Sequence, residues 1–248
     1  MKLLRSEEGC PWDREQDHKS IRKNFIEETY EAVEAIDKED MTLLREELGD
    51  VLLQVVFHTQ MEEENGTFTF DDVVTDLCQK LIIRHPHVFG TVEVENSGEV
   101  LKNWETIKNQ VKGTETFTET LTSVPAVFPA LMRSEKIAHR AAKAGMCYPD
   151  TESAFEDLED EVGELWEAIE EGSRDHMEEE LGDLLFSCTN VAEKLGLDAE
   201  QALSRSCEKF IARFEKVEQM AREQGIQMET AELDVLNSLW KKAKEQLI

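Results

Sequence analysis

The chain repeats itself after 133 residues, and this repeat restricts the folds that it can adopt. EETYEAVEAI (27–36) matches DEVGELWEAI (160–169), and EELGDVLL (46–53) matches EELGDLLF (179–186). The step from the first acidic segment to the second is 19 residues in both copies. Chance acidity in a glutamate-rich chain would not keep that register. A chain of 248 residues has room for two domains of about 100–150 residues, so the repeat predicts two units of one kind.

Composition favours an all-α fold, because only 5 residues are Pro and Glu, Leu, Lys and Ala are abundant. Besides the two helices of the second acidic copy, we expect helices at about 20–36, 42–64, 70–84, 100–112, 129–143 and 199–224, and a last one through Trp240. Residues 1–20 and 85–90 should be irregular. A Thr-rich stretch from Gly113 to Pro125 predicts a linker. The expected organisation is an N-terminal domain at 1–112, a linker at 113–125 and a C-terminal domain at 126–248.

Each repeat contains two acidic couples. In the second copy, Glu161 and Glu164 are three residues apart on one expected helix, and Glu180 and Asp183 keep that spacing on the next. Side chains at this spacing project from one helix face. A break at Gly172 lets the second helix fold back antiparallel on the first. The seam between the helices should bury apolar side chains, namely Leu165, Trp166, Ile169, Leu181, Leu184 and Leu185.

This hairpin predicts a metal site. Carboxylates crowded near a core repel one another, and a hard divalent cation with oxygen ligands would offset that cost. The expected ligands in the C-terminal domain are Glu161, Glu164, Glu180 and Asp183. Their counterparts in the N-terminal domain are Glu28, Glu31, Glu47 and Asp50. Most of the other acidic residues are expected to form a solvated surface.

A cationic and aromatic set recurs as well. CQKLIIR (78–84) corresponds to CEKFIAR (207–213), and WETIK (104–108) corresponds to WKKAK (240–244). Lys209 and Arg213 share one helical face, while Trp240 and Lys244 share another. Any one such lysine is more often a surface residue. The repeated set instead indicates phosphate and base binding.

Charge and cysteine usage exclude several classes of protein. The net charge of −28 is spread over both halves, so binding to nucleic-acid polymers or to an anionic membrane is not expected. The 5 cysteines are odd in number and form no CxxC pair, which favours free thiols in a reducing compartment. No apolar run resembles a signal peptide or a membrane span. We therefore expect a cytoplasmic protein.

These motifs resemble the MazG family of bacterial nucleoside triphosphate pyrophosphohydrolases over nearly the whole chain. The similarity includes GCPWDREQ (9–16), LREELGDVLLQVVF (44–57), RHPHVFG (84–90), PALMRSEKI (129–137) and EEELGDLLF (178–186). The family pattern EExxE followed by ExxD fits both acidic repeats, with Asp160 in place of the first Glu in the second copy. The resemblance implies an all-α fold of the MazG/dUTPase kind and a homodimer of helical bundles. It also implies cleavage of NTPs and dNTPs to the monophosphate and pyrophosphate with Mg²⁺, mainly in the C-terminal domain.

The residues suggest how such cleavage would proceed, with Mn²⁺ as a substitute for Mg²⁺ and little selectivity for the base. A carboxylate, Glu180 or Glu179, would take a proton from the attacking water. Cationic side chains would neutralise the leaving phosphates, and Trp240 would stack on the base. The expected catalytic residues are Glu161, Glu164, Glu180, Asp183, Lys209 and Arg213. The expected substrate-binding residues are Asp160, Glu179, Lys209, Arg213, Trp240 and Lys244.

Three alternatives remain open at this point. A di-iron carboxylate bundle needs Glu-x-x-His on paired helices, but only Glu15 and His18 fit that pattern and they are not repeated. A non-catalytic helical binding module would hold the metal for structure alone. A deoxyuridine-specific hydrolase on the same fold would differ in the base that it accepts.

Overall fold

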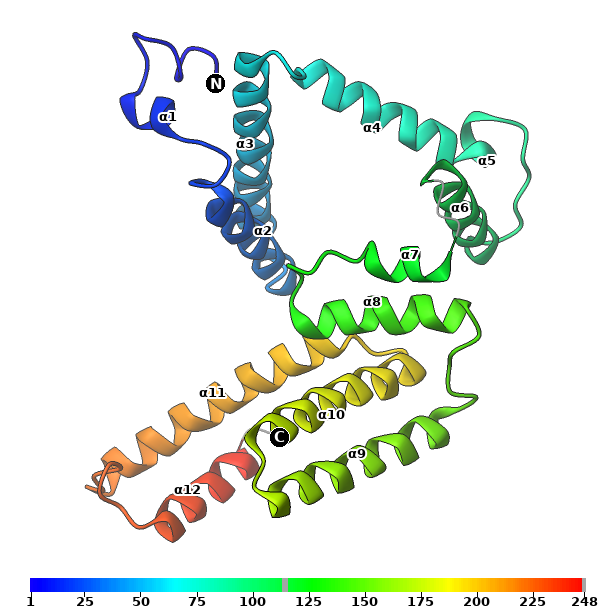
Figure 1. The fold of residues 1–248 in the computed structure, drawn as a ribbon. Coiled ribbons are helices and arrows are strands. Elements are labelled where there is room, and N and C mark those ends of the chain that lie inside the picture. Colours follow the sequence, from blue (N-terminus) through cyan, green and yellow to red (C-terminus); the bar gives the residue numbers. More distant parts are fainter. Residues whose placement is uncertain (113–115, 247–248) are drawn as a thin grey trace. The chain divides into compact units, whose positions relative to one another are not determined.

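A computed structural model describes residues 1–112 and 116–246, and these residues form helices joined by short connections (Figure 1). No strand occurs in the described part of the chain, which confirms the predicted all-α class. The chain divides into two units, Met1–Gly113 (unit one) and Thr114–Ile248 (unit two). None of the described helices is both long and apolar enough to cross a lipid bilayer.

Unit one is built around a long antiparallel helix pair. Its helices are α1 (Pro11–Glu15), α2 (Arg22–Asp37), α3 (Met41–Asn65), α4 (Phe70–Arg84), α5 (Pro86–Phe89) and α6 (Ser97–Lys112). Helix α2 packs along α3, and α4 contacts α3, α5 and α6. Asp40 starts α3 by accepting hydrogen bonds from two backbone N–H groups, and Gly66 ends it with a φ of 72°. Ile21, Phe57 and Met61 form a buried core cluster.

Unit two contains a second hairpin of the same kind. Its helices are α7 (Phe117–Thr122), α8 (Ala130–Lys143), α9 (Thr151–Glu171), α10 (Arg174–Leu195), α11 (Ala199–Glu223) and α12 (Leu233–Gln246). Helix α9 packs along α10, α8 contacts α7, α10 and α11, and α11 pairs with α12. Val217, Ala221, Leu239 and Ala243 form the buried core of the α11–α12 pair.

Three short helices lie where the sequence predicted irregular chain. Helices α1 and α5 each begin with a Pro, whose fixed φ suits the first helical turn. Helix α7 lies within the expected linker, where a capping box between Thr116 and Glu119 starts it. Arg140 of α8 donates hydrogen bonds to the Thr120 carbonyl and, at 2.8 Å, to Ser123 Oγ. These contacts hold the end of α7 against α8.

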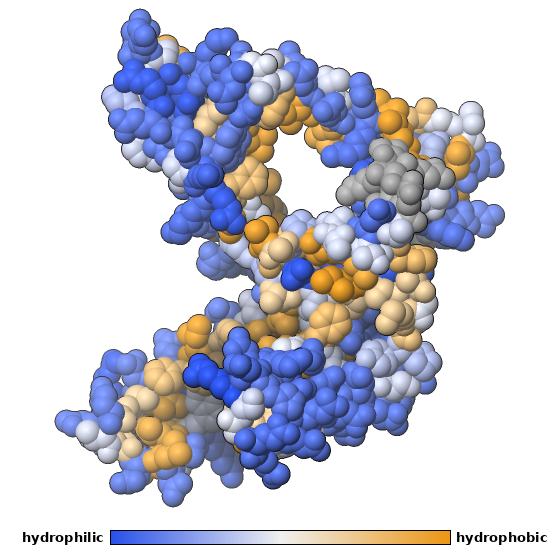
Figure 2. Space-filling model, viewed as in Figure 1, coloured by the Kyte–Doolittle hydropathy of each residue, from blue (hydrophilic) through white to orange (hydrophobic). Residues whose placement is uncertain are grey.

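The predicted apolar seam between α9 and α10 is wrong. Leu165 and Leu184 are half-buried, but the larger part of the set is exposed: Trp166 at 63%, Ile169 at 44%, and Leu181 and Leu185 at 48% each. Most of the buried positions of the two helices hold small or polar residues instead, including Ala154, Ala168 and Ser187. Both helices carry a wider apolar face than one partner helix can cover. Figure 2 shows hydrophobic residues on the visible surface of both units.

Candidate metal centres

A two-residue reversal places the acidic couples of unit two on facing helices. Helix α9 begins at Asp150, whose carboxylate accepts a hydrogen bond from the Ser153 N–H at 2.8 Å. It ends at Gly172, which has a φ of 73° and supplies the left-handed conformation of a helix C-terminus. Ser173 then caps α10 through the His176 N–H. Local capping therefore fixes the turn that brings α9 back along α10.

The second centre consists of Glu161 and Glu164 on α9 and Glu180 and Asp183 on α10. One carboxylate oxygen each of Glu161, Glu164 and Glu180 lies within 4.8 Å of the other two. Glu180 is 7% exposed, Glu161 is half-buried and Glu164 is exposed. Asp183 lies outside this close trio, although its charge acts on Glu161. Three of the four predicted carboxylates, two from α9 and one from α10, thus lie close together.

The electrostatics of the second centre fit a bound cation. Burial raises the pKa of Glu161, and the charges of Glu164 and Asp183 raise it further. Glu161 Oε2 and Glu180 Oε2 are buried without a hydrogen-bond partner among the described residues. A buried, unpaired carboxylate oxygen costs free energy. A hard divalent cation would satisfy both oxygens, so this all-carboxylate donor set suits a divalent metal.

His176 adds a contact that the sequence analysis missed. Its Nε2 lies 3.0 Å from Glu180 Oε1, and its Nδ1 lies 2.9 Å from Glu171 Oε2. The hydrogen bond to Glu171 raises the pKa of His176, and the charges of Glu171 and Glu180 add to it. The one available signal was the i,i+4 spacing of His176 and Glu180. The repeat offers no help, because the corresponding residue of unit one is Leu43.

The first centre consists of Glu28 and Glu31 on α2 and Glu47 and Asp50 on α3. One oxygen each of Glu28, Glu47 and Asp50 lies within 4.8 Å of the other two. Burial raises the pKa of both Glu28 and Glu47, followed by the charge of Asp50 on Glu28 and that of Glu31 on Glu47. Three of the four predicted carboxylates therefore gather in unit one, and Glu31 lies outside the close trio although its charge acts on Glu47. Its close trio contains the ExxD aspartate, whereas the close trio of the second centre contains Glu164.

A hydrogen-bonded network adjoins the second centre, and sequence reasoning missed this too. Asp157 lies one turn before Glu161 on α9, and its Oδ2 accepts a 2.6 Å hydrogen bond from Ser187 Oγ. The Tyr148 side chain lies beside Asp157 and Asn190. Burial and the contact with Asp157 raise the pKa of Tyr148 to about 12, so its hydroxyl stays protonated. Only folding brings these residues together, since they come from a loop and two helices.

The other predicted site residues lie around these helices or on α11 and α12. Asp160 and Glu179 are exposed on α9 and α10, and Lys209 and Lys244 are exposed on α11 and α12. Arg213 is half-buried, and its Nε has no hydrogen-bond partner among the described residues.

The aromatic member of each recurring set packs within its own helix pair. The half-buried Trp240 ring lies 4.9 Å from the Phe210 ring. In unit one, the Arg84 guanidinium lies 5.4 Å from the centre of the Trp104 ring. The recurring sets thus join α4 to α6 and α11 to α12.

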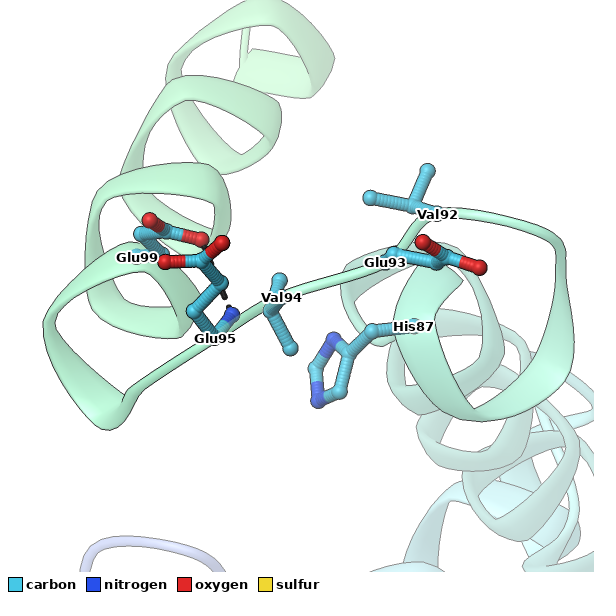
Figure 3. Close-up of a pocket in the computed structure, with 6 residues that line it drawn as sticks. All are labelled: His87, Val92, Glu93, Val94, Glu95 and Glu99. Carbon is cyan, nitrogen blue, oxygen red and sulfur yellow. Dashed lines mark hydrogen bonds between the residues drawn. The ribbon is translucent and has the colours of Figure 1, made fainter.

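A separate cavity of about 560 Å³ lies beside α5 and α6 in unit one (Figure 3). Its lining residues are His87, Val92, Glu93, Val94, Glu95 and Glu99. The Glu95 N–H donates a 3.1 Å hydrogen bond to Glu99 Oε2, drawn as a dashed line in Figure 3. Within the described residues, three metal-binding groups converge only in the two centres above. The acidic cavity of Figure 3 is therefore not a third centre.

The fold and its sites define a duplicated all-α protein with one carboxylate centre in each helical hairpin. Residues 16–89 and 150–218 match the MazG nucleotide pyrophosphohydrolase domain. These two ranges include the hairpins α2–α3 and α9–α10 that build the centres. The chain belongs to the MazG family, which confirms the resemblance seen in its motifs.

Two relatives that match over nearly their whole length give the same result. A Thermotoga maritima protein named nucleoside triphosphate pyrophosphohydrolase/pyrophosphatase MazG is 43% identical over 244 residues, covering 98% of this chain and 92% of the relative. The nucleoside triphosphate pyrophosphohydrolase of Escherichia coli K12 is 41% identical over 253 residues, covering 100% of this chain and 95% of the relative. The Bacillus subtilis protein YabN is 42% identical over 243 residues, which make up 50% of its own length.

Proposed function

We propose that this protein hydrolyses nucleoside triphosphates to nucleoside monophosphate and pyrophosphate, chiefly at the second centre. The observation that carries the proposal is a pair of buried oxygens, Glu161 Oε2 and Glu180 Oε2, which come from two different helices and have no hydrogen-bond partner in the part of the chain that the structure describes. The activity named for the relatives from Thermotoga maritima and Escherichia coli supports this reaction. Water attacks the α-phosphorus, the bond from that phosphorus to the bridging oxygen breaks, and pyrophosphate leaves.

The residues of the second centre would hold Mg²⁺, with Mn²⁺ as a substitute. Glu161, Glu164, Glu180 and Asp183 are the proposed ligands, and Glu28, Glu31, Glu47 and Asp50 are their counterparts in the first centre. When bound, the cation supplies positive charge for the phosphates and lowers the pKa of the attacking water. Without that charge, either centre would repel a polyphosphate.

Individual side chains of unit two have distinct roles in the proposed hydrolysis. His176 occupies Glu180 Oε1 through a 3.0 Å contact, which holds the carboxylate in one orientation. Glu180 and the exposed Glu179 beside it are the candidates for accepting the proton of the attacking water, and Glu179 is favoured because His176 and the cation would occupy both oxygens of Glu180. Lys209 and Arg213 on α11 neutralise the departing pyrophosphate. Asp160, Trp240 and Lys244 stay proposed substrate contacts, and a broad range of bases stays a prediction.

Exposed apolar side chains on α9 and α10 support a homodimer. Trp166, Leu181 and Leu185 are each about half exposed or more in the single chain, so the hairpin presents apolar surface to solvent. A second copy packed on the hairpin would cover them. Leu181→Glu with Leu185→Glu should convert the dimer to a monomer in sedimentation-velocity experiments, and a wild-type protein that sediments as a monomer would contradict the dimer. A cytoplasmic location also stays a prediction.

The reaction is tested by product analysis with Mg²⁺, using ATP, GTP, CTP, UTP and dUTP as substrates. Anion-exchange chromatography should show pyrophosphate and the monophosphate, and Glu180→Gln should abolish both. Glu47→Gln, its counterpart in the first centre, should keep most of the activity. Glu170→Gln is the matched control, since Glu170 is exposed on α9 and outside the centre. Release of orthophosphate would contradict the reaction, and cleavage of dUTP alone would indicate the deoxyuridine-specific alternative.

A further inference from the structure

The first 20 residues of unit one form a strap along the C-terminal half of α3, drawn in blue beside that helix in Figure 1. Lys2 Nζ lies 3.0 Å from Glu63 Oε1. Arg5 donates hydrogen bonds of 2.9–3.1 Å to the Glu64 carboxylate. These two contacts are ordinary ion pairs between the strap and α3. A third contact joins two histidines and has a different chemistry.

His18 of the strap and His58 of α3 face each other through their Nδ1 atoms, which lie 2.7 Å apart. The two ring planes differ by 2°, and the ring centroids are 5.0 Å apart. The centroid separation exceeds the distance between the nitrogens by about the diameter of an imidazole ring, so both nitrogens lie near the line that joins the centroids. The rings therefore meet edge to edge in one plane, which is the geometry of an N–H···N hydrogen bond.

This hydrogen bond can hold only one proton. Hydrogen bonds lower the pKa of Glu62 to about 2, so its carboxylate is ionised and can only accept. His18 Nε2 lies 2.6 Å from Glu62 Oε1 and is therefore the donor of that contact. An imidazole nitrogen donates when it is protonated and accepts when it is not. Either Nδ1 atom can thus be the donor, but the bond is lost when both rings are imidazolium ions, because both Nδ1 atoms then carry hydrogens.

The groups around the pair lie on three segments. On α3, the Glu62 carboxylate contacts the histidine of the strap. On α2, the Phe25 ring lies edge-on to the other histidine with its centroid at 5.7 Å, and Lys23 pairs within its own helix. In the strap, Asp17 accepts hydrogen bonds from two backbone N–H groups of its own turn. The histidine of the strap thus has a carboxylate partner, whereas the histidine of α3 lies against an aromatic ring.

We propose that His18 and His58 form a proton-sensitive tie, which holds the strap on α3 while the pair carries at most one positive charge and opens when both rings are protonated. Opening loosens the cover of a core. The strap begins at Met1, which packs against the buried cluster that contains Ile21 and Phe57. Acidification therefore weakens the contact of the strap with this cluster, and neither carboxylate centre takes part.

The direction of the pH dependence follows from His58. Burial lowers the pKa of His58, and the charge of His18 lowers it further. The unfolded chain binds this proton near the ordinary value of 6.5, whereas the folded chain binds it only at lower pH. The contribution of the tie is therefore complete above about pH 6.5 and is lost as the pH falls through the lowered pKa of His58.

Nitrogen-15 NMR of the histidine rings follows these protons directly in the wild-type protein. The buffers contain EDTA, so that the imidazoles meet protons and no metal ion. The pair should take up its two protons in separate steps about one pH unit or more apart, because the second proton breaks the bond. Uptake of both protons in one step near pH 6.5 would overturn the proposal.

A variant tests whether the tie holds the strap. In His58→Asn, the side-chain amide can donate or accept, so its contact with His18 no longer depends on a proton at position 58. Trypsin cleavage is measured after Lys19, which is exposed at the end of the strap. The ratio of the wild-type rate to the variant rate cancels the pH dependence of trypsin itself. This ratio should be near one at pH 7.5 and rise about fivefold at pH 5.5, as expected for the loss of one hydrogen bond.

The matched control is His139→Asn, because His139 of unit two contacts Glu193 and not a second histidine. Its ratio should stay near one at both pH values. A His58→Asn ratio that does not change with pH would show that the pair does not hold the strap. Circular dichroism checks that the variants fold, and the NMR titration of wild type decides the question if they do not.

Discussion

His176 Nε2 lies 3.0 Å from Glu180 Oε1, one turn away on α10. This contact occupies one oxygen of a carboxylate that is 7% exposed and leaves the other, Oε2, without a partner among the described residues. A metal ligand is often oriented in this way by a neighbouring side chain that does not touch the metal. The first centre has no such neighbour at this position, because Leu43 stands there.

Replacement of His176 should therefore weaken the second centre alone. His176→Leu introduces the residue of unit one, and it should lower Mg²⁺ affinity or kcat about tenfold or more, in line with the usual effect of removing an orienting partner. A Mg²⁺ titration of pyrophosphate release measures both quantities. His139→Leu is the control, since His139 is on α8 and pairs with Glu193 instead. Wild-type values in His176→Leu would show that the contact does not position Glu180.

Metal binding should also raise the thermal stability of the protein. A ligand that binds only the folded state raises the melting temperature in a concentration-dependent way. Mg²⁺ should therefore raise the melting temperature of wild type, and EDTA should reverse the effect. Glu180→Gln with Glu47→Gln, which changes the most buried carboxylate of each centre, should abolish the shift. A full shift in this double variant, followed by circular dichroism, would place the ion elsewhere.

The Ser187–Asp157 hydrogen bond should contribute to folding. Ser187 is 2% exposed, and Ser187→Ala would remove the 2.6 Å donor to a carboxylate on the facing helix. The free energy of unfolding should fall by about 1–2 kcal/mol in urea titrations. Ser204→Ala is an exposed control on α11 and should change the stability by less than about 0.5 kcal/mol. Equal stability of the two variants would contradict a structural role for the bond.

Two glycines of α9 should respond in opposite directions to the same substitution. Gly172 has a φ of 73°, so Gly172→Ala should destabilise the hairpin by about 1 kcal/mol. Gly163 is inside the helix with open space around its Cβ position, so Gly163→Ala should stabilise it by about 0.5–1 kcal/mol. Thermal unfolding of the two variants beside wild type checks the sign. A stabilising Gly172→Ala would contradict the left-handed turn.

Low pH should reduce the folding stability of unit one, because Glu62 becomes protonated. Hydrogen bonds from Thr67, His18 and Asn65 lower the pKa of Glu62 from 4.5 to about 2. A lowered pKa in the folded state means that the contribution is complete above about pH 4.5 and is lost as the pH falls towards about 2. Glu62→Gln should thus be less stable than wild type at neutral pH, and the gap should close near pH 2. A gap that is constant from pH 6 to pH 2 in thermal unfolding would refute this assignment.

Much of the fold could be predicted because the acidic segments occur twice in the same register. The 133-residue register places Glu28 with Glu161 and Glu47 with Glu180, and the i,i+3 spacing puts each couple on one helix face. In the structure Glu28 lies close to Glu47 and Glu161 lies close to Glu180, because short-range helix geometry and one tight turn suffice to bring them together.

The missed features depend on long-range packing. Tyr148 reaches Asp157 from a loop whose path no periodicity encodes, and Asn190 looks like any polar residue on α10. The prediction of an apolar seam between α9 and α10 was wrong for a related reason. An apolar stripe predicts burial, but it does not say whether the partner is the next helix or another molecule, and Trp166 is 63% exposed in the single chain.

Phe57 limits how far the two units can be interchanged. Because its ring is wedged among Ile21 and Met61, exchanging it for the amide that α10 carries at the corresponding position, Asn190, would open a hole in the interior of unit one. A single Phe57→Asn change would therefore cost stability in unit one before it could supply an amide there.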